Sequence, residues 1–164
     1  MLSSFTLLLP SLLAVLLTCH GKPLPVENMK YQIHQTSKII KSLIEEYPIS
    51  QRLSFELSDV VPGTKPIQGL GSAIDSLMAF RRIVDSLWGP KSQLSVDLST
   101  LRGHLEREMT SLQCPARTPS SFQDLDLFLK DNRTYSLTLC PAVLQRLKNY
   151  MNNLLLSLDT VKTC

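Results

Sequence analysis

The chain has 164 residues, a formal net charge of +3 and 43% apolar residues. This length suits one domain, and charged residues at 19% are too few and too balanced for a disordered chain or a polybasic nucleic-acid-binding protein. No apolar run reaches the roughly 18 residues that span a bilayer, which excludes a multi-pass membrane protein.

Residues 1–21 have the features of a secretory signal peptide. Phe5 to Leu17 is uncharged and almost wholly apolar, but a helix of that length extends only about 20 Å, which is too short for a hydrocarbon core of about 30 Å. Cys19 and Gly21 have the spacing of a signal-peptidase site, which the alternative of a buried N-terminal helix does not explain. We therefore expect cleavage after Gly21, a secreted domain over residues 22–164 and an oxidising extracellular compartment.

Four segments of the remaining chain show the helical periodicity of apolar residues, and none shows the alternation of a strand. Their expected ranges are 27–47, 72–88, 92–112 and 141–161. Pro48 and Gly89-Pro90 are expected to end the first two helices. Ser72 is expected to cap the second helix, and Pro141 is expected to occupy the first position of the fourth.

The connections between these segments distinguish bundle topologies. The second and third helices are joined by a short loop and must be antiparallel neighbours, whereas residues 48–71 and 113–140 form long connections. An up-down-up-down bundle needs only about two to eight residues per connection. We therefore expect an all-α four-helix bundle of up-up-down-down topology with two long crossover loops. The second crossover is expected to hold a short helix that covers one end of the bundle with Phe122, Leu125, Leu127, Phe128 and Leu129.

Three cysteines remain after the expected cleavage, and they test the topology. Cys140 and Cys164 lie at opposite ends of the fourth helix, roughly 30 Å apart, although Cα atoms in a disulfide lie within about 7 Å. Parallel third and fourth helices would bring Cys114 to Cys164, whereas antiparallel helices would bring it to Cys140. Because the long connection favours the parallel arrangement, we predict a Cys114–Cys164 disulfide. Cys140 is then unpaired, and its thiol is buried, capped or joined to another molecule.

The sequence lacks the motifs of catalysis and of cofactor binding. His34 and His104 belong to no Glu-x-x-His pair, and we expect both to be solvated. Gly69-Leu70-Gly71 lacks the third glycine of a dinucleotide loop and is expected to be a flexible start of a helix. Arg81-Arg82 is expected to lie on a solvated helix face. The prediction is therefore a protein that is not an enzyme and that uses no cofactor and no metal.

Asn132-Arg133-Thr134 is an N-glycosylation sequon. It lies on an expected surface loop between two helices of a chain that we expect to be secreted. Sequons also arise by chance, but this context favours a glycan on Asn132.

The mature chain resembles the leptin family of helical cytokines. The residues that carry the resemblance are Ile39-Ile40-Lys41-Ser42-Leu43-Ile44, Ser58-Asp59-Val60-Val61-Pro62-Gly63, Asp97-Leu98, Leu101-Arg102, Arg146-Leu147, Leu158-Asp159 and the terminal Cys164. Pro66-Ile67-Gln68-Gly69-Leu70-Gly71 is similar to the non-mammalian branch of the family. The order of these segments, together with the terminal cysteine, makes the resemblance specific.

The resemblance implies a left-handed cytokine bundle and a secreted hormone that binds a leptin-type class I cytokine receptor. It implies activation of Janus-kinase/STAT signalling and regulation of energy balance and appetite. A main receptor-binding surface on the first and third helices maps onto Lys41, Ser42 and Gln93. A second, activating surface on the first crossover and the start of the fourth helix maps onto Asp59, Val60, Val61, Thr138 and Leu139. The implied protein is a monomer before receptor binding, with no nucleic-acid partner and no membrane insertion.

Two alternatives remain open at this point. Val60 and Val61 could simply pack onto the bundle instead of contacting a receptor. The whole chain could instead be a secreted lipid carrier of the apolipoprotein type, with amphipathic helices that open onto lipid. Such helices need a strongly basic polar face, and the fourth helix has only Arg146, Lys148 and Lys162 as cations.

Overall fold

The computed structural model describes residues 25–47, 57–118, 120–160 and 164, so the expected signal peptide lies outside the described residues. The described chain contains helices and no strand. Four long helices form a bundle: α2 (Pro25–Glu45), α4 (Leu70–Trp88), α5 (Gln93–Ser111) and α7 (Ser136–Ser157). A short helix, α6 (Gln123–Asp131), and a 3-10 helix, η1 (Arg133–Tyr135), lie in the second crossover.

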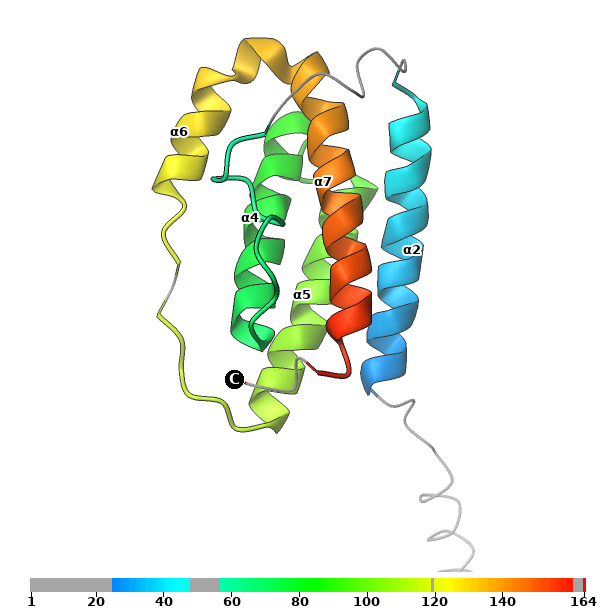
Figure 1. The fold of residues 1–164 in the computed structure, drawn as a ribbon, viewed down its shortest axis with the longest axis vertical. Coiled ribbons are helices and arrows are strands. Elements are labelled where there is room, and N and C mark those ends of the chain that lie inside the picture. The colour runs from blue at the N-terminus through cyan, green and yellow to red at the C-terminus, as the bar shows by residue number, and fades with distance from the viewer. Residues whose placement is uncertain (1–24, 48–56, 119, 161–163) are drawn as a thin grey trace, which may run out of the picture.

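The four long helices have the predicted up-up-down-down topology. In Figure 1, α2 and α4 run towards the upper end of the bundle, and α5 and α7 run towards the lower end. α2 packs against α5 and α7, and α4 packs against the same two helices. The four helices therefore form a ring in the order α2–α5–α4–α7, and the α2–α7 and α4–α5 sides of the bundle are opposite to each other.

The apolar stripes that the sequence predicts meet inside this ring and form one core. Phe80 of α4 and Tyr150 of α7 are fully enclosed, and their ring centroids lie 5.2 Å apart. The Tyr150 hydroxyl donates to the carbonyl oxygen of Ala73 at 3.1 Å, which satisfies the one polar group of this buried side chain. Thr36 of α2 is equally enclosed and donates to the carbonyl oxygen of Gln32 at 2.9 Å.

The second helix begins earlier than the sequence predicts. α4 starts at Leu70, and Gly69 is its N-cap with φ 148° and ψ 177°, a conformation that an L side chain rarely adopts. Ser72 is therefore not the cap. Its hydroxyl instead accepts a hydrogen bond from the Gln68 amide at 3.3 Å, which ties the end of the first crossover to the first turn of α4.

The fourth helix also begins earlier, at Ser136, so Pro141 lies inside α7 and not at its first position. The 3-10 turn η1 leads directly into α7, and the chain is already helical when it reaches the proline. The ring of Pro141 has the backbone angle of a helix but no N–H, so the carbonyl of Leu137 loses its helical partner. A proline therefore indicated a helix here but not the residue at which the helix begins.

The second crossover packs its short helix against α4 near the end of the bundle where α7 begins (Figure 1). Leu125 and Leu129 of α6 are buried, whereas Leu127 is exposed, because it lies on the opposite face of the helix. The prediction was therefore wrong for Leu127. Arg82 of α4 donates to both carboxylate oxygens of Asp126, at 2.7 and 2.8 Å, and fastens α6 to α4.

The predicted disulfide is confirmed. Cys114, which follows α5, is bonded to Cys164 at the end of the chain, with 5.5 Å between the Cα atoms. The bond joins the lower end of α5 to the segment after α7, as expected for parallel helices. Cys140, in the first turns of α7, is free and buried.

Candidate functional site

The residues predicted for the first surface lie towards one end of the α2–α5 side. Lys41 and Ser42 are exposed near the end of α2, and Gln93 is exposed at the start of α5. Because these two helices pack antiparallel, the end of one lies beside the start of the other. Lys41 pairs with Glu45 at 4.0 Å, and Gln93 donates to the Asp97 carboxylate at 2.7 Å. The three residues are therefore exposed near the same end of the bundle, and Lys41 and Gln93 make polar contacts within their own helices.

A single arginine of α7 holds the first crossover in place. Arg146 donates from Nη1 to the carbonyl oxygen of Val61 and from Nη2 to that of Leu57, each at 3.3 Å. Gly63, with φ 105°, lets the chain pass close to this arginine, since a Cβ there would lie 3.3 Å from the Arg146 Cγ and Cδ atoms. The described start of the crossover is thus fixed to the bundle at two carbonyl groups.

The segment that Arg146 holds forms a turn in which Val60 is exposed to solvent and Val61 is buried in the core. The Val61 amide donates to the carbonyl oxygen of Ser58 at 3.1 Å, which closes a β-turn with Asp59 and Val60 at its centre. Asp59 is exposed, the Val60 residue is 38% exposed and Val61 is 0% exposed. The alternative that these residues pack onto the bundle therefore holds for Val61 and not for Val60. Val61 can support a contact surface but cannot form it in this conformation.

The two residues predicted for the activating surface at the start of α7 also differ in burial. Thr138 is half-buried, whereas Leu139 is 1% exposed and belongs to the core. Tyr135 and Leu137 are the residues that this turn exposes, at 60% and 69%. Sequence reasoning missed both because it began the helix at Pro141. A helix from Ser136 would have placed Leu137 off the apolar stripe.

Val60 also borders a hollow of about 310 Å³ between the first crossover, α4 and α6. Pro62 lines it beside Val60, and Phe122 and Leu125 line it from the second crossover. The exposed tip of the turn is therefore next to apolar side chains of α6.

Cys140 lies beside Tyr47, the last residue described after α2. Burial is the main cause that raises the pKa of the Cys140 thiol. Burial, together with the neighbouring Cys140 side chain, raises the pKa of Tyr47 to about 12. Both groups are therefore protonated at neutral pH, and a buried neutral thiol is a poor nucleophile. Of the three alternatives for Cys140, the structure supports burial.

The two histidines differ in their surroundings. His34 is exposed as expected, but His104 is half-buried, with its Nδ1 atom 2.7 Å from Nη2 of Arg107. Burial, and then the positive charge of Arg107, lower the pKa of His104 below its usual 6.5. The folded state therefore binds a proton at His104 less readily than the unfolded state does.

This difference predicts a loss of stability in mild acid. As the pH falls through about 6.5, the unfolded state takes up the proton first, so the free energy of unfolding decreases. We expect His104→Gln to be less sensitive than the wild type to a change from pH 7.5 to pH 5. Urea unfolding at both pH values measures this, and equal losses in the two proteins would contradict it.

The sequon lies at the end of α6. Asn132 follows the helix and donates from Nδ2 to the carbonyl oxygen of Phe128 at 2.9 Å, and Thr134 is exposed in η1. A glycan would be attached to this same amide nitrogen, which carries a second hydrogen besides the one donated to Phe128. Glycosylation of Asn132 stays a prediction.

The described residues hold neither a metal-binding cluster nor a membrane-spanning helix. No group of three or more His, Cys, Asp or Glu side chains in this part of the chain could hold a metal ion. No helix there combines the length and the apolar character needed to cross a membrane. The candidate residues lie instead on open helix faces and a crossover turn.

A bundle of this topology, with two long crossovers and a disulfide to its last residue, is of the helical cytokine class. Residues 26–164 match the family model described as Leptin, and the chain therefore belongs to the leptin family. A comparison with curated proteins gives no match. The leptin family is one of secreted hormones and cytokines rather than enzymes, and membership implies a class I cytokine receptor as the partner.

Proposed function

We propose that this protein is a secreted hormone that activates Janus-kinase/STAT signalling through a leptin-type receptor and so regulates energy balance and appetite. The match of residues 26–164 to the leptin family carries this proposal. The Cys114–Cys164 disulfide supports secretion, because such bonds persist in oxidising compartments. The chain leaves the cell after cleavage following Gly21 and reaches its receptor as a monomer.

Receptor binding and receptor activation are assigned to two separate surfaces of the protein. Lys41, Ser42 and Gln93 make the main contact with the receptor from the polar α2–α5 side. Asp59 and Val60 make the activating contact from the turn that Arg146 holds, and Thr138 at the start of α7 is assigned to the same surface. An apolar tip next to a carboxylate suits a small hydrophobic contact with a polar rim. Val61 and Leu139 support this surface from the core.

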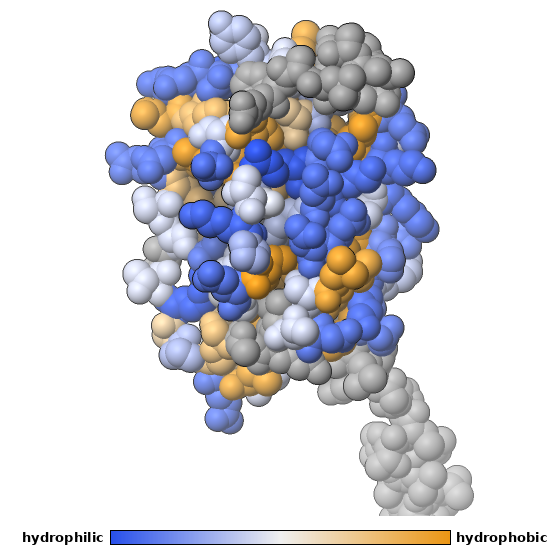
Figure 2. Space-filling view, viewed as in Figure 1, coloured by the Kyte–Doolittle hydropathy of each residue, from blue (hydrophilic) through white to orange (hydrophobic). Residues whose placement is uncertain are grey.

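The lipid-carrier alternative has little support in the described residues. The face seen in Figure 2 is mostly hydrophilic, and its hydrophobic residues form separate patches. The exposed large apolar side chains come from several elements, namely Tyr31, Val60, Val96, Leu112, Leu127, Tyr135, Leu137 and Leu156. Lipid binding requires a continuous apolar face along a helix, and in this structure the continuous apolar stripes face the core, so a lipid carrier would have to open the bundle.

A pair of double variants tests the division of surfaces. Lys41→Glu with Gln93→Ala is expected to lower receptor affinity by about tenfold or more, because it changes the charge and shape of the main contact. Asp59→Ala with Val60→Ala is expected to keep affinity within a few-fold of wild type but to abolish signalling. Binding to the receptor ectodomain and STAT phosphorylation in receptor-bearing cells measure the two effects.

Two details of the design keep the comparison clean. Val61 is left intact, because its truncation would create a cavity in the core. Lys65→Glu is the control for charge reversal, since Lys65 is exposed on the first crossover and belongs to neither α2 nor α5. If the Asp59/Val60 variant is folded and loses binding and signalling to the same extent, the division is refuted.

A further inference from the structure

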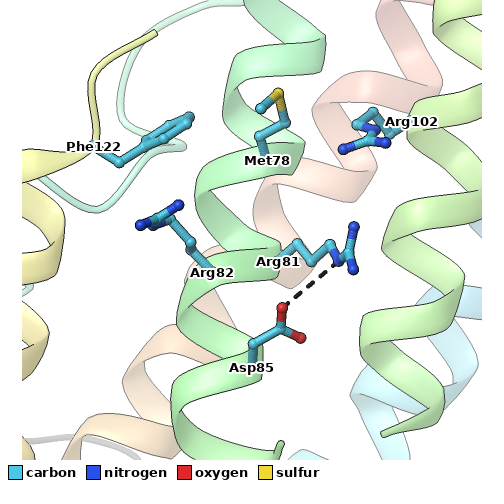
Figure 3. A pocket seen from close by; sticks show the side chains of 6 residues that line it. All are labelled: Met78, Arg81, Arg82, Asp85, Arg102 and Phe122. Carbon is cyan, nitrogen blue, oxygen red and sulfur yellow. Dashed lines mark ion pairs between the residues drawn. The ribbon is translucent and has the colours of Figure 1, made fainter. Parts of the chain in front are cut away.

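Three arginines surround a hollow between α4 and α5 (Figure 3). Arg81 and Arg82 extend from α4, and Arg102 extends from α5. The hollow has a volume of about 160 Å³, and its other lining residues are Met78, Asp85 and Phe122. Three arginines and one carboxylate therefore line this space, and Figure 3 shows Arg82 turned towards Phe122, away from Arg81 and Arg102.

The three arginines differ in whether their guanidinium N–H groups have hydrogen-bond acceptors. Both oxygens of Asp126 accept from Arg82, so that guanidinium group is paired. Arg81 Nε lies 3.7 Å from a carboxylate oxygen of Asp85, while the other oxygen of Asp85 accepts from the Ser95 hydroxyl. Arg102 Nε lies 3.2 Å from Glu106. Nevertheless, the Nε atoms of Arg81 and Arg102 are buried and have no hydrogen-bond partner among the described residues.

Figure 3 shows the side chains of Arg81 and Arg102 extending from two helices into the same gap. The side chains are about one-third exposed, at 35% and 30%, so their charges are only partly screened by water. Each of the two is paired with a carboxylate of its own helix, Asp85 for Arg81 and Glu106 for Arg102, and Arg81 also donates to the Ser99 hydroxyl at 3.4 Å. Their buried Nε donors stay unsatisfied, and a tetrahedral oxyanion between the two side chains would accept hydrogen bonds from them.

A second hollow of about 440 Å³ adjoins the first through Arg82, which lines both. Lys130 and Arg133 line it from the second crossover. A small free anion would use only the first hollow, whereas a chain with repeated anionic groups would use both. We propose that Arg81, Arg102, Lys130 and Arg133 form a binding surface for a sulfated polysaccharide, with one sulfate between the first two and another at the last two.

A sulfated polysaccharide is the ligand that fits both the extracellular compartment and the positive charge of these arginines. The proposal rests on the proposed secretion, which brings the protein among extracellular sulfated polysaccharides. The surface is also distinct from the main receptor contact, since Arg102 lies two and a half turns after Gln93 on α5 and therefore on the opposite face of that helix.

Binding of a heparin hexasaccharide to residues 22–164, measured by calorimetry, tests the proposal. Arg81→Gln with Arg102→Gln is expected to lower affinity roughly tenfold for each arginine. The matched control is Arg107→Gln with Lys65→Gln, which removes the same charge from two other exposed positions and is expected to stay within twofold of wild type. Receptor-ectodomain affinity is expected to be unchanged in the Arg81/Arg102 variant, so this result is separate from that of the proposed function.

A measurement on the wild type guards against a variant that fails to fold. Addition of the hexasaccharide is expected to shift the Nε–H resonances of Arg81 and Arg102 in NMR spectra, and Arg81→Lys with Arg102→Lys is expected to bind less tightly although the charge is kept. Equal loss in the glutamine variant and its control would overturn the proposal, as would unshifted Nε–H resonances. Inorganic sulfate that binds as tightly as the hexasaccharide would overturn the polysaccharide assignment.

Discussion

Replacing Arg146 with alanine is expected to abolish signalling while receptor affinity stays within a few-fold of wild type. Arg146 donates to the carbonyl oxygens of Val61 and Leu57, and its stem packs against Gly63. Without it, the Asp59-Val60 turn is no longer held against α7, although its residues are unchanged. STAT phosphorylation and ectodomain binding, measured on the same preparation, would show the two effects.

Lys148→Ala is a suitable control, because Lys148 is a half-buried cation two residues further along α7. It is expected to signal normally. Amide hydrogen exchange reports on the turn itself, since the Val61 amide is bonded to Ser58 and is expected to exchange faster in the Arg146 variant. Full signalling in a variant with fast exchange at Val61 would contradict a role for the held turn.

Replacing Cys114 with serine is expected to reduce the free energy of unfolding by about 4 kcal/mol. The Cys114–Cys164 disulfide closes a loop with a sequence separation of 50 residues, and on the chain-entropy model the cost scales with the logarithm of that length. A loss of this size is a large share of the 5–15 kcal/mol that is typical of a folded domain. Urea unfolding monitored by circular dichroism measures it.

Cys140→Ala is the matched control, because it removes the free cysteine and leaves the disulfide intact. Since it truncates one buried side chain by a single atom, we expect it to cost only about 1 kcal/mol. A similar loss of unfolding free energy in both variants would contradict the disulfide as a main source of stability.

The Cys140→Ala variant also tests whether the buried thiol is needed for signalling, and we expect that it is not.

The bundle could be predicted because its determinants are local or geometric. The stripe predicted for the first helix repeats at helical spacing: its members from Met29 to Ile40 are buried, and Leu43 and Tyr47 at its end are half-buried. Loop lengths restrict which helices can be parallel, and the length of the fourth helix excludes a bond between its two ends. The disulfide followed from these two constraints and was confirmed.

The details of the candidate surfaces depend on contacts between distant segments and could not be predicted in the same way. Val60 and Val61 are alike in sequence, and only the Ser58 turn and the hydrogen bond from Arg146 decide which one is buried. Leu139 was assigned to the activating surface by the family resemblance, which does not show how the chain enters α7. With η1 leading into α7, Leu139 turns into the core.

The arginines of α4 illustrate the same limit. Arg81-Arg82 was expected to lie on a solvated helix face, and Arg82 does lie about half exposed beside Asp126. Arg81 instead extends into the gap between α4 and α5, next to Asp85 and Arg102. Helical spacing gives the direction of a side chain, but only the packing of a second helix shows what that side chain meets.

The central claim is that this chain is a ligand of a leptin-type class I cytokine receptor. Its most direct test is the binding of purified, disulfide-bonded residues 22–164 to the immobilised ectodomain of the cognate receptor, with STAT phosphorylation measured in cells that express it. We predict saturable binding and phosphorylation that both depend on the dose. A folded protein that neither binds the ectodomain saturably nor raises phosphorylation would contradict the claim.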